Sequence, residues 1–165
     1  MKTQQLTSLM AGTALWCLAT VSGTAQAQVP QYGNNVNLEQ ANKVVVAAIA
    51  EARKQNLPMA IAVVDNAGLL VAFERMDNTQ TASVGIAQDK AASAAMYRRP
   101  TKVFQDVLAA GGVGLRVLTL RGANAVEGGV PLTMDGKIIG AIGVSGGTSE
   151  QDGVVAKAGI EGMGK

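Results

Sequence analysis

The sequence predicts an α+β fold, a single domain in which helices cover a mostly antiparallel sheet. Short apolar runs are joined by two hairpin turn signals, one at residues 65–68 and the other at Asp135-Gly136. Segments with apolar residues at helical spacing precede, separate and follow these hairpins. The strands of a hairpin are antiparallel, so the sheet is expected to be mostly antiparallel. The helices are expected to pack on the faces of this sheet. The chain contains no internal repeat.

The first predicted helix covers residues 38–55. Asn37 suits the N-cap, and Gln40 three residues later completes a variant of the capping box. Asn56 and Pro58 end the helix. The preceding segment, residues 28–36, is polar and contains Pro30 and Gly33, so we expect a flexible arm.

The first hairpin is predicted over residues 59–76. Residues 59–65 form a short apolar run, which is typical of a strand buried on both faces. The turn Asp65-Asn66-Ala67-Gly68 favours a left-handed Gly68, so residues 69–76 pair with the first strand.

Two helices follow the hairpin. The first covers residues 81–97 and carries a stripe of small residues, which predicts close packing against a neighbour; Pro100 ends it. The second covers residues 101–110, with Thr101 as its cap and Gly111 as its stop.

The last third predicts strands and a final helix. Residues 115–120 are a strand candidate, and residues 130–134 and 137–146 flank Asp135-Gly136 as a second hairpin. Pro131 places the first strand of this hairpin at a sheet edge. A helix is predicted over residues 149–163.

The first 27 residues match a secretory signal peptide. Lys2 precedes a largely apolar stretch over residues 9–21, and Ala25-Gln26-Ala27 suits the cleavage site. The apolar stretch is too short for a transmembrane anchor, and Trp16 before Cys17 argues against lipidation. We therefore expect a periplasmic or secreted protein without a membrane anchor, whose domain covers residues 37–165.

Composition excludes several kinds of chemistry. The chain has 14 Lys and Arg against 12 Asp and Glu, which argues against a nucleic-acid partner. It has no His, and its one Cys and one Trp lie in the leader. No metal site of the usual nitrogen or sulfur kind, no Ser-His-Asp triad and no His-ligated haem is expected.

The turn between the last strand and the last helix raises two interpretations. Gly146, Gly147, Thr148 and Glu150 suit an anion nest that holds a carboxylate or a haem propionate. They equally suit helix capping, with the acidic side chain favouring the helix dipole. We favour capping, with at least one glycine at positive φ and the turn serving as a pocket wall.

Three further positions are candidates for ligand binding. Arg75 could clamp a carboxylate beside Asp77, or the two could form an exposed ion pair. Lys90 could be a desolvated base beside an Ala-rich face, although a solvated helix Lys is the plainer interpretation. Glu127 could be a general base or a charge that protects an edge strand.

Haem iron could be ligated without His by Tyr97, Met76 or Met96. The plainer interpretations are that Tyr97 packs at a helix end and that the methionines fill the core.

Four stretches resemble the GlcG/HbpS family of haem-binding or "haem-degrading" domains, which also resembles the C-terminal domain of PduO-type proteins. They are LPMAIAVVDNAGLLVAFERMDN, SVGIAQDKAASAA, EGGVPL and DGKIIGAIGVSGGTSEQD, and the resemblance covers about residues 37–163. It implies a profilin-like sandwich with a five-stranded antiparallel sheet, oligomer formation, and association with haem or a corrinoid in some members. It implies no single reaction.

The sequence leads to three functional hypotheses. The first is an exported homo-oligomer that binds haem or a related tetrapyrrole, without His ligation, at a subunit interface. The second is a metal-free enzyme that acts on a small carboxylate with Arg75, Lys90 and Glu127. The third is a purely structural partner protein. The small-residue helix at residues 81–97 and the edge strand with Pro131 offer flat surfaces for self-association.

Overall fold

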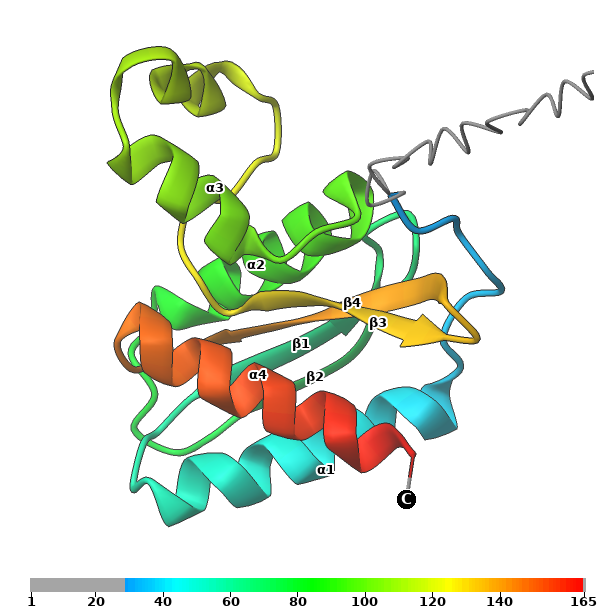
Figure 1. The fold of residues 1–165 in the computed structure, drawn as a ribbon. Helices are drawn as coiled ribbons and strands as arrows, with labels where there is room; N and C mark the ends of the chain where they lie inside the picture. The colour runs from blue at the N-terminus through cyan, green and yellow to red at the C-terminus, as the bar shows by residue number, and fades with distance from the viewer. Residues whose placement is uncertain (1–28, 165) are drawn as a thin grey trace, which may run out of the picture.

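The structure, a computed structural model, describes residues 29–164 (Figure 1). The predicted signal peptide lies outside the described residues. The elements in chain order are α1 (Leu38–Lys54), β1 (Ala60–Val64), β2 (Leu70–Arg75), α2 (Ser83–Tyr97), α3 (Thr101–Ala109), the 3₁₀ helix η1 (Gly112–Thr119), β3 (Gly129–Met134), β4 (Lys137–Ser145) and α4 (Ser149–Met163). Within the described part, no helix is both long and apolar enough to cross a membrane.

The sheet is antiparallel, with strand order β2-β1-β4-β3. Both predicted hairpins are confirmed, with Gly68 at φ 80° and Asp135 and Gly136 at 51° and 72°. Pro131 lies in β3 at the sheet edge, as predicted. The α+β class is therefore confirmed, but the sheet described here has four strands and not the five that the family resemblance implied.

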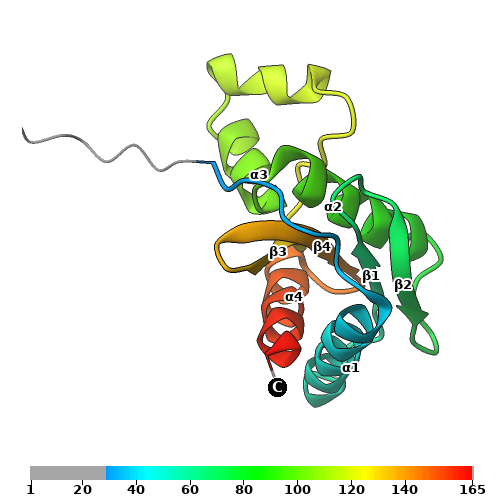
Figure 2. The same ribbon diagram turned by 90° about the vertical axis from the view of Figure 1, so that its right-hand side faces the viewer.

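The two faces of the sheet are covered differently. Helices α1 and α4 lie side by side on one face, and α2 lies on the other (Figures 1 and 2). Large side chains such as Met59, Ile61 and Ile142 fill the layer under α1 and α4. The layer under α2 is built almost entirely from alanine. Successive β1 residues alternate between these layers, which is why its sequence is apolar throughout.

Helix α2 packs directly onto the backbone of β4. A Cβ atom at Gly143 would overlap the carbonyl oxygen of Ala87 and lie 2.5 Å from the amide nitrogen of Ala91. The predicted close packing of the small-residue stripe is thus confirmed. Because this stripe is buried against the sheet of its own chain, it offers no surface for self-association.

The strand prediction for residues 115–120 is wrong. These residues belong largely to η1, which folds back onto α3 and forms a lobe with it. The start of α3 is anchored on β3 through Thr101, and η1 projects away from the sandwich (Figures 1 and 2). Gly111 and Gly112, at φ 68° and 55°, reverse the chain. A Cβ atom at Gly114 would overlap the carbonyl oxygen of Val107, so only glycine permits this return.

The segment before α1, for which the sequence predicts a flexible arm, lies along β4. The amides of Gly33 and Val36 donate to the carbonyls of Ile138 and Ile139 at 2.7 and 2.6 Å. The amide of Ile138 donates to the carbonyl of Gln31 at 2.8 Å. These bonds continue the sheet beyond the end of β1 and bring the arm beside the β3–β4 hairpin (Figure 2).

Candidate functional site

The turn from β4 into α4 gathers four of the predicted site residues and is a helix cap. Thr148 is the N-cap: its hydroxyl accepts from the amide of Gln151, whose side-chain oxygen accepts from the amide of Thr148 at 2.9 Å. Gly146 has φ 155°, and a Cβ there would lie 2.8 Å from the Cα of Met59. Gly146 is therefore the glycine that the backbone conformation of this turn requires. At Gly147 a larger residue would instead meet the side chain of Gln151.

The amides of this turn already bind acceptors of the chain itself. The amide of Gly147 donates to the Oδ1 atom of Asp152 at 3.0 Å. The backbone amide of Glu150, together with the hydroxyl of Thr148, lowers the pKa of the Glu150 carboxyl. The amide groups at the N-terminus of α4 are therefore already hydrogen-bonded to side chains of this chain. This geometry supports helix capping over the binding of an external anion.

Behind this turn lies a buried ion pair between α2 and α4. The side chain of Lys90 is only 1% exposed, and its Nζ donates to Asp152 Oδ2 at 2.7 Å and to the carbonyl of Val144 at 3.2 Å. Burial raises the pKa of the Asp152 carboxyl, and the hydrogen bond from Lys90 acts against this. The plainer interpretation of Lys90 as a solvated helix lysine is therefore wrong. The contacts of Lys90 tie α2, β4 and α4 together.

Glu127 lies at the rim of the same region. Its side chain is about 10% exposed, and its Oε2 is 3.9 Å from the Nζ of Lys102. Its carboxylate packs so closely on α4 that a Cβ at Gly153 would overlap Oε1. The next residue, Gly128, has φ 125°, and a Cβ there would lie 2.9 Å from the Nζ of Lys90. Glycine at both positions leaves room for these two charged side chains.

Arg75 and Asp77 lie in a second region, at the end of β2. They line a hollow of about 300 Å³ with Met76, Glu74, Ile49 and Arg53 from the last turn of α1. An adjoining hollow of about 330 Å³ shares Arg53, Met76 and Asp77. We call the two together the Arg53–Arg75 hollow.

The turn after β2 is closed by hydrogen bonds that position these side chains. The hydroxyl of Thr79 donates to the carbonyl of Met76 at 2.7 Å, and the guanidinium of Arg75 donates to the carbonyl of Thr79 at 3.2 Å. Among residues 29–164, neither Arg53 nor Arg75 lies within ion-pair distance of a carboxylate. Two guanidiniums are therefore available to a ligand beside a thioether. Arg53 is not among the residues predicted from the sequence, since only the fold brings the end of α1 beside β2.

The other proposed haem ligands lie elsewhere. The hydroxyl of Tyr97 donates to the carbonyl of Arg121 at 2.8 Å, and its ring packs edge-on against Phe104 with centroids 5.1 Å apart. Met96 is 44% exposed and lines a separate hollow with Asp89 and Asn124. Of the three proposed ligands, only Met76 lines the Arg53–Arg75 hollow.

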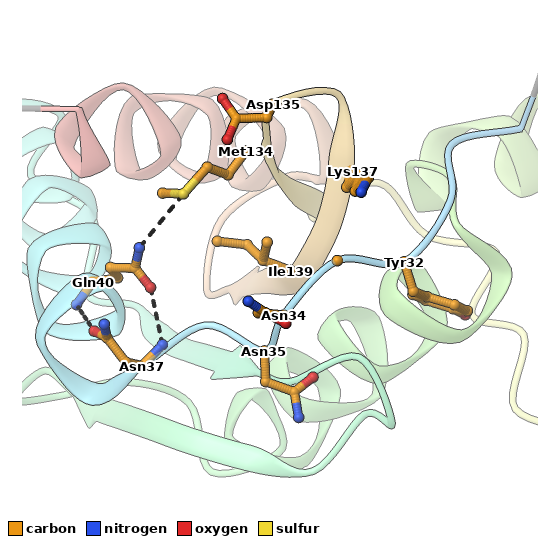
Figure 3. Close-up of a pocket in the computed structure, with 10 residues that line it drawn as sticks. Tyr32, Asn34, Asn35, Asn37, Gln40, Met134, Asp135, Lys137 and Ile139 are labelled. Atoms are coloured by element: carbon orange, nitrogen blue, oxygen red, sulfur yellow. Dashed lines mark hydrogen bonds between the residues drawn. The ribbon is translucent and has the colours of Figure 1, made fainter.

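A third region is the hollow between the N-terminal arm, the start of α1 and the β3–β4 hairpin (Figure 3). Its volume is about 580 Å³, larger than that of either part of the Arg53–Arg75 hollow. The residues that line it are Tyr32, Gly33, Asn34, Asn35, Asn37, Gln40, Met134, Asp135, Lys137 and Ile139. None of the site residues predicted from the sequence lines this hollow, because the prediction treated the arm as separate from the domain.

Comparison with known proteins identifies similar chains. A family model described as haem degrading protein HbpS-like matches residues 36–161. The protein GlcG of Escherichia coli (strain K12) is 40% identical over 107 residues, covering 65% of this chain and 78% of GlcG.

Two solved structures share the fold. A double mutant of HbpS from Streptomyces reticuli superposes with a TM-score of 0.72 at 27% identity, covering 93% of this chain and 97% of HbpS. A complex of PduOC with haem superposes with a TM-score of 0.70 at 27% identity, covering 78% of this chain and 94% of PduOC.

Proposed function

This chain belongs to the family described as haem degrading protein HbpS-like, and from this premise we propose that it binds haem or a related tetrapyrrole in the Arg53–Arg75 hollow. The observation that carries the proposal is that Met76 lines the same hollow as two guanidiniums that form no ion pair in residues 29–164. The haem complex of the similar PduOC supports the ligand class.

Arg53 and Arg75 share the hollow with Glu74 and Asp77, so its formal charges cancel; the groups that fit such a ligand are the two guanidiniums, which are not paired with these carboxylates. Arg guanidiniums bind carboxylates in a bidentate manner, which suits the propionates of a tetrapyrrole. A methionine thioether is a known axial ligand of haem iron. Ile49 and the aliphatic part of Met76 supply an apolar wall. Since the chain contains no His, the axial ligand from this chain must be of another kind.

The alternative of a metal-free enzyme is less well supported by the geometry. It requires Arg75, Lys90 and Glu127 to reach one substrate. Lys90 is enclosed by Asp152 and Val144, whereas Arg75 lines a hollow at the end of β2 to which neither of the other two contributes.

We include export and self-association in the proposal. Both parts of the Arg53–Arg75 hollow are open to the surface, and each is small for a tetrapyrrole. A bound tetrapyrrole would therefore leave one face exposed, and a second subunit would cover that face. The lobe of α3 and η1 supplies apolar surface for such contacts, with Val113 76% and Leu118 71% exposed.

Absorbance titration with haemin tests the ligand and its site. The Met76→Leu variant should shift the Soret band, and replacing Arg53 and Arg75 by Gln should weaken binding by at least about tenfold. Met96→Leu and Tyr97→Phe are matched controls, since both side chains lie outside the hollow and should leave the spectrum unchanged. Binding that is insensitive to Met76, Arg53 and Arg75 but changes with Tyr97 would refute the site.

A further inference from the structure

The hollow of Figure 3 includes three polar side chains without a partner among the described residues. Asn34, Asp135 and Lys137 take part in no side-chain hydrogen bond or ion pair among residues 29–164. They come from two separate segments, the arm and the β3–β4 hairpin, and line one hollow of about 580 Å³.

The frame around these side chains is well ordered by hydrogen bonds. The arm is held by three backbone bonds to β4, described above. Gly33 lies close to the hairpin, since a Cβ there would lie 3.1 Å from the Cβ of Lys137, a tight contact. Asn37 and Gln40 are held by the capping box of α1, in which each side-chain oxygen accepts from the other residue's backbone amide (Figure 3).

The capping box leaves the NH₂ groups of Asn37 and Gln40 without a strong acceptor among residues 29–164. Because the side-chain oxygens are occupied, Asn37 and Gln40 retain their NH₂ groups; that of Gln40 meets only the weak acceptor Met134 Sδ at 3.9 Å. Asp135 supplies acceptors, Lys137 supplies donors, and Asn34 supplies both. Ile139 provides an apolar floor.

The charges of the hollow cancel, and this decides the ligand class. One carboxylate and one ammonium line it beside four neutral amide side chains, so neither an anion nor a cation is favoured overall. Closely spaced donors and acceptors over an apolar floor match a molecule that carries hydroxyl groups around an apolar ring face. We propose that this hollow is a second ligand site, which binds a neutral carbohydrate of one or two sugar units. This site is separate from the Arg53–Arg75 hollow and does not depend on haem binding.

Calorimetric titration of the purified protein with glucose, N-acetylglucosamine and maltose tests the proposal. At least one of these sugars should bind saturably at millimolar or lower concentration. The Asn34→Ala and Lys137→Met variants should each weaken that binding by about tenfold or more, since each removes hydrogen bonds to the ligand. Lys157→Met is the matched control, because Lys157 is exposed on α4 and does not line the hollow.

Melting temperatures of the same variants verify that each remains folded. The proposal is overturned if none of the three sugars binds, or if folded Asn34→Ala and Lys137→Met bind as the unmodified protein does. It is also overturned if the zwitterion glycylglycine binds more tightly than every sugar, because the charges of Asp135 and Lys137 would then determine which ligand binds.

Discussion

Replacing Lys90 by Met removes one partner of the ion pair that joins α2 to α4. The substitution keeps most of the side-chain volume but leaves the Asp152 carboxylate buried, with the amide of Gly147 as its remaining close donor. Breaking a buried ion pair in this way costs about 3–5 kcal/mol, because a buried charge is left unpaired. For a domain of this size the loss corresponds to a decrease in melting temperature of roughly 10–20 °C.

Urea unfolding followed by circular dichroism measures this cost, and two further variants locate its cause. Lys102→Met makes the same change at an exposed lysine, which pairs with Asp106 on α3 and lies 3.9 Å from Glu127, and should cost much less stability because solvent screens these pairs. The double variant Lys90→Met with Asp152→Asn should be more stable than Lys90→Met alone, since no unpaired charge remains and Asn still accepts from Gly147.

The reasoning would be refuted if Lys90→Met cost no more than Lys102→Met, or if the double variant were less stable than Lys90→Met alone. Either result would mean that the carboxylate of Asp152 is solvated or paired differently. A folded Lys90→Met variant should also bind haemin with an unchanged spectrum. A shifted Soret band would contradict the placement of the ligand away from Lys90.

The remaining predictions concern the packing, the cap and the leader. Gly143→Ala should destabilise the fold by about 2–3 kcal/mol or more, because its Cβ overlaps the backbone of α2; an unchanged thermal melt would contradict this. Thr148→Ala should cost about 1 kcal/mol in urea unfolding without changing haemin affinity, whereas weaker haemin binding would support an anion nest. Mass spectrometry should find a mature N-terminus near Gln28, and an intact Met1 would disprove export by cleavage. Light scattering should give more than the monomer mass, and a monomer at micromolar concentration would argue against a shared site.

Local signals predicted the elements well where each signal acts within a few residues. The capping box at Asn37, the cap at Thr148 and the turns at Gly68 and Asp135-Gly136 depend on neighbouring residues alone, and all are present in the structure. The predicted cap at Thr101 is wrong, because Thr101 lies inside the helix after Pro100 and its hydroxyl accepts from the amide of Gly129 in β3 instead. The strand prediction for residues 115–120 failed because an apolar run without a partner strand is equally compatible with a short helix. Packing of η1 on α3 decided that choice.

The candidate sites were predicted less completely than the elements. The sequence left two interpretations open for the turn formed by Gly146, Gly147, Thr148 and Glu150, helix capping and anion binding. Asp152 decides between them in favour of capping. Its carboxylate accepts from Gly147 while it pairs with Lys90, 62 residues away in the chain. A short-range pattern contains no information about such a partner.

The sequence by itself determined the α+β class, the two antiparallel hairpins, the edge position of β3 and the absence of His chemistry. These follow from turn residues, apolar periodicity and composition, which are local or additive properties. Only the tertiary structure decided that Lys90 is enclosed, that Arg53 lies beside Arg75 and Met76, and that the arm completes a polar hollow with the β3–β4 hairpin. The physical reason is that burial and charge pairing depend on contacts between residues far apart in the chain, and those contacts exist only after the helices have packed on the sheet.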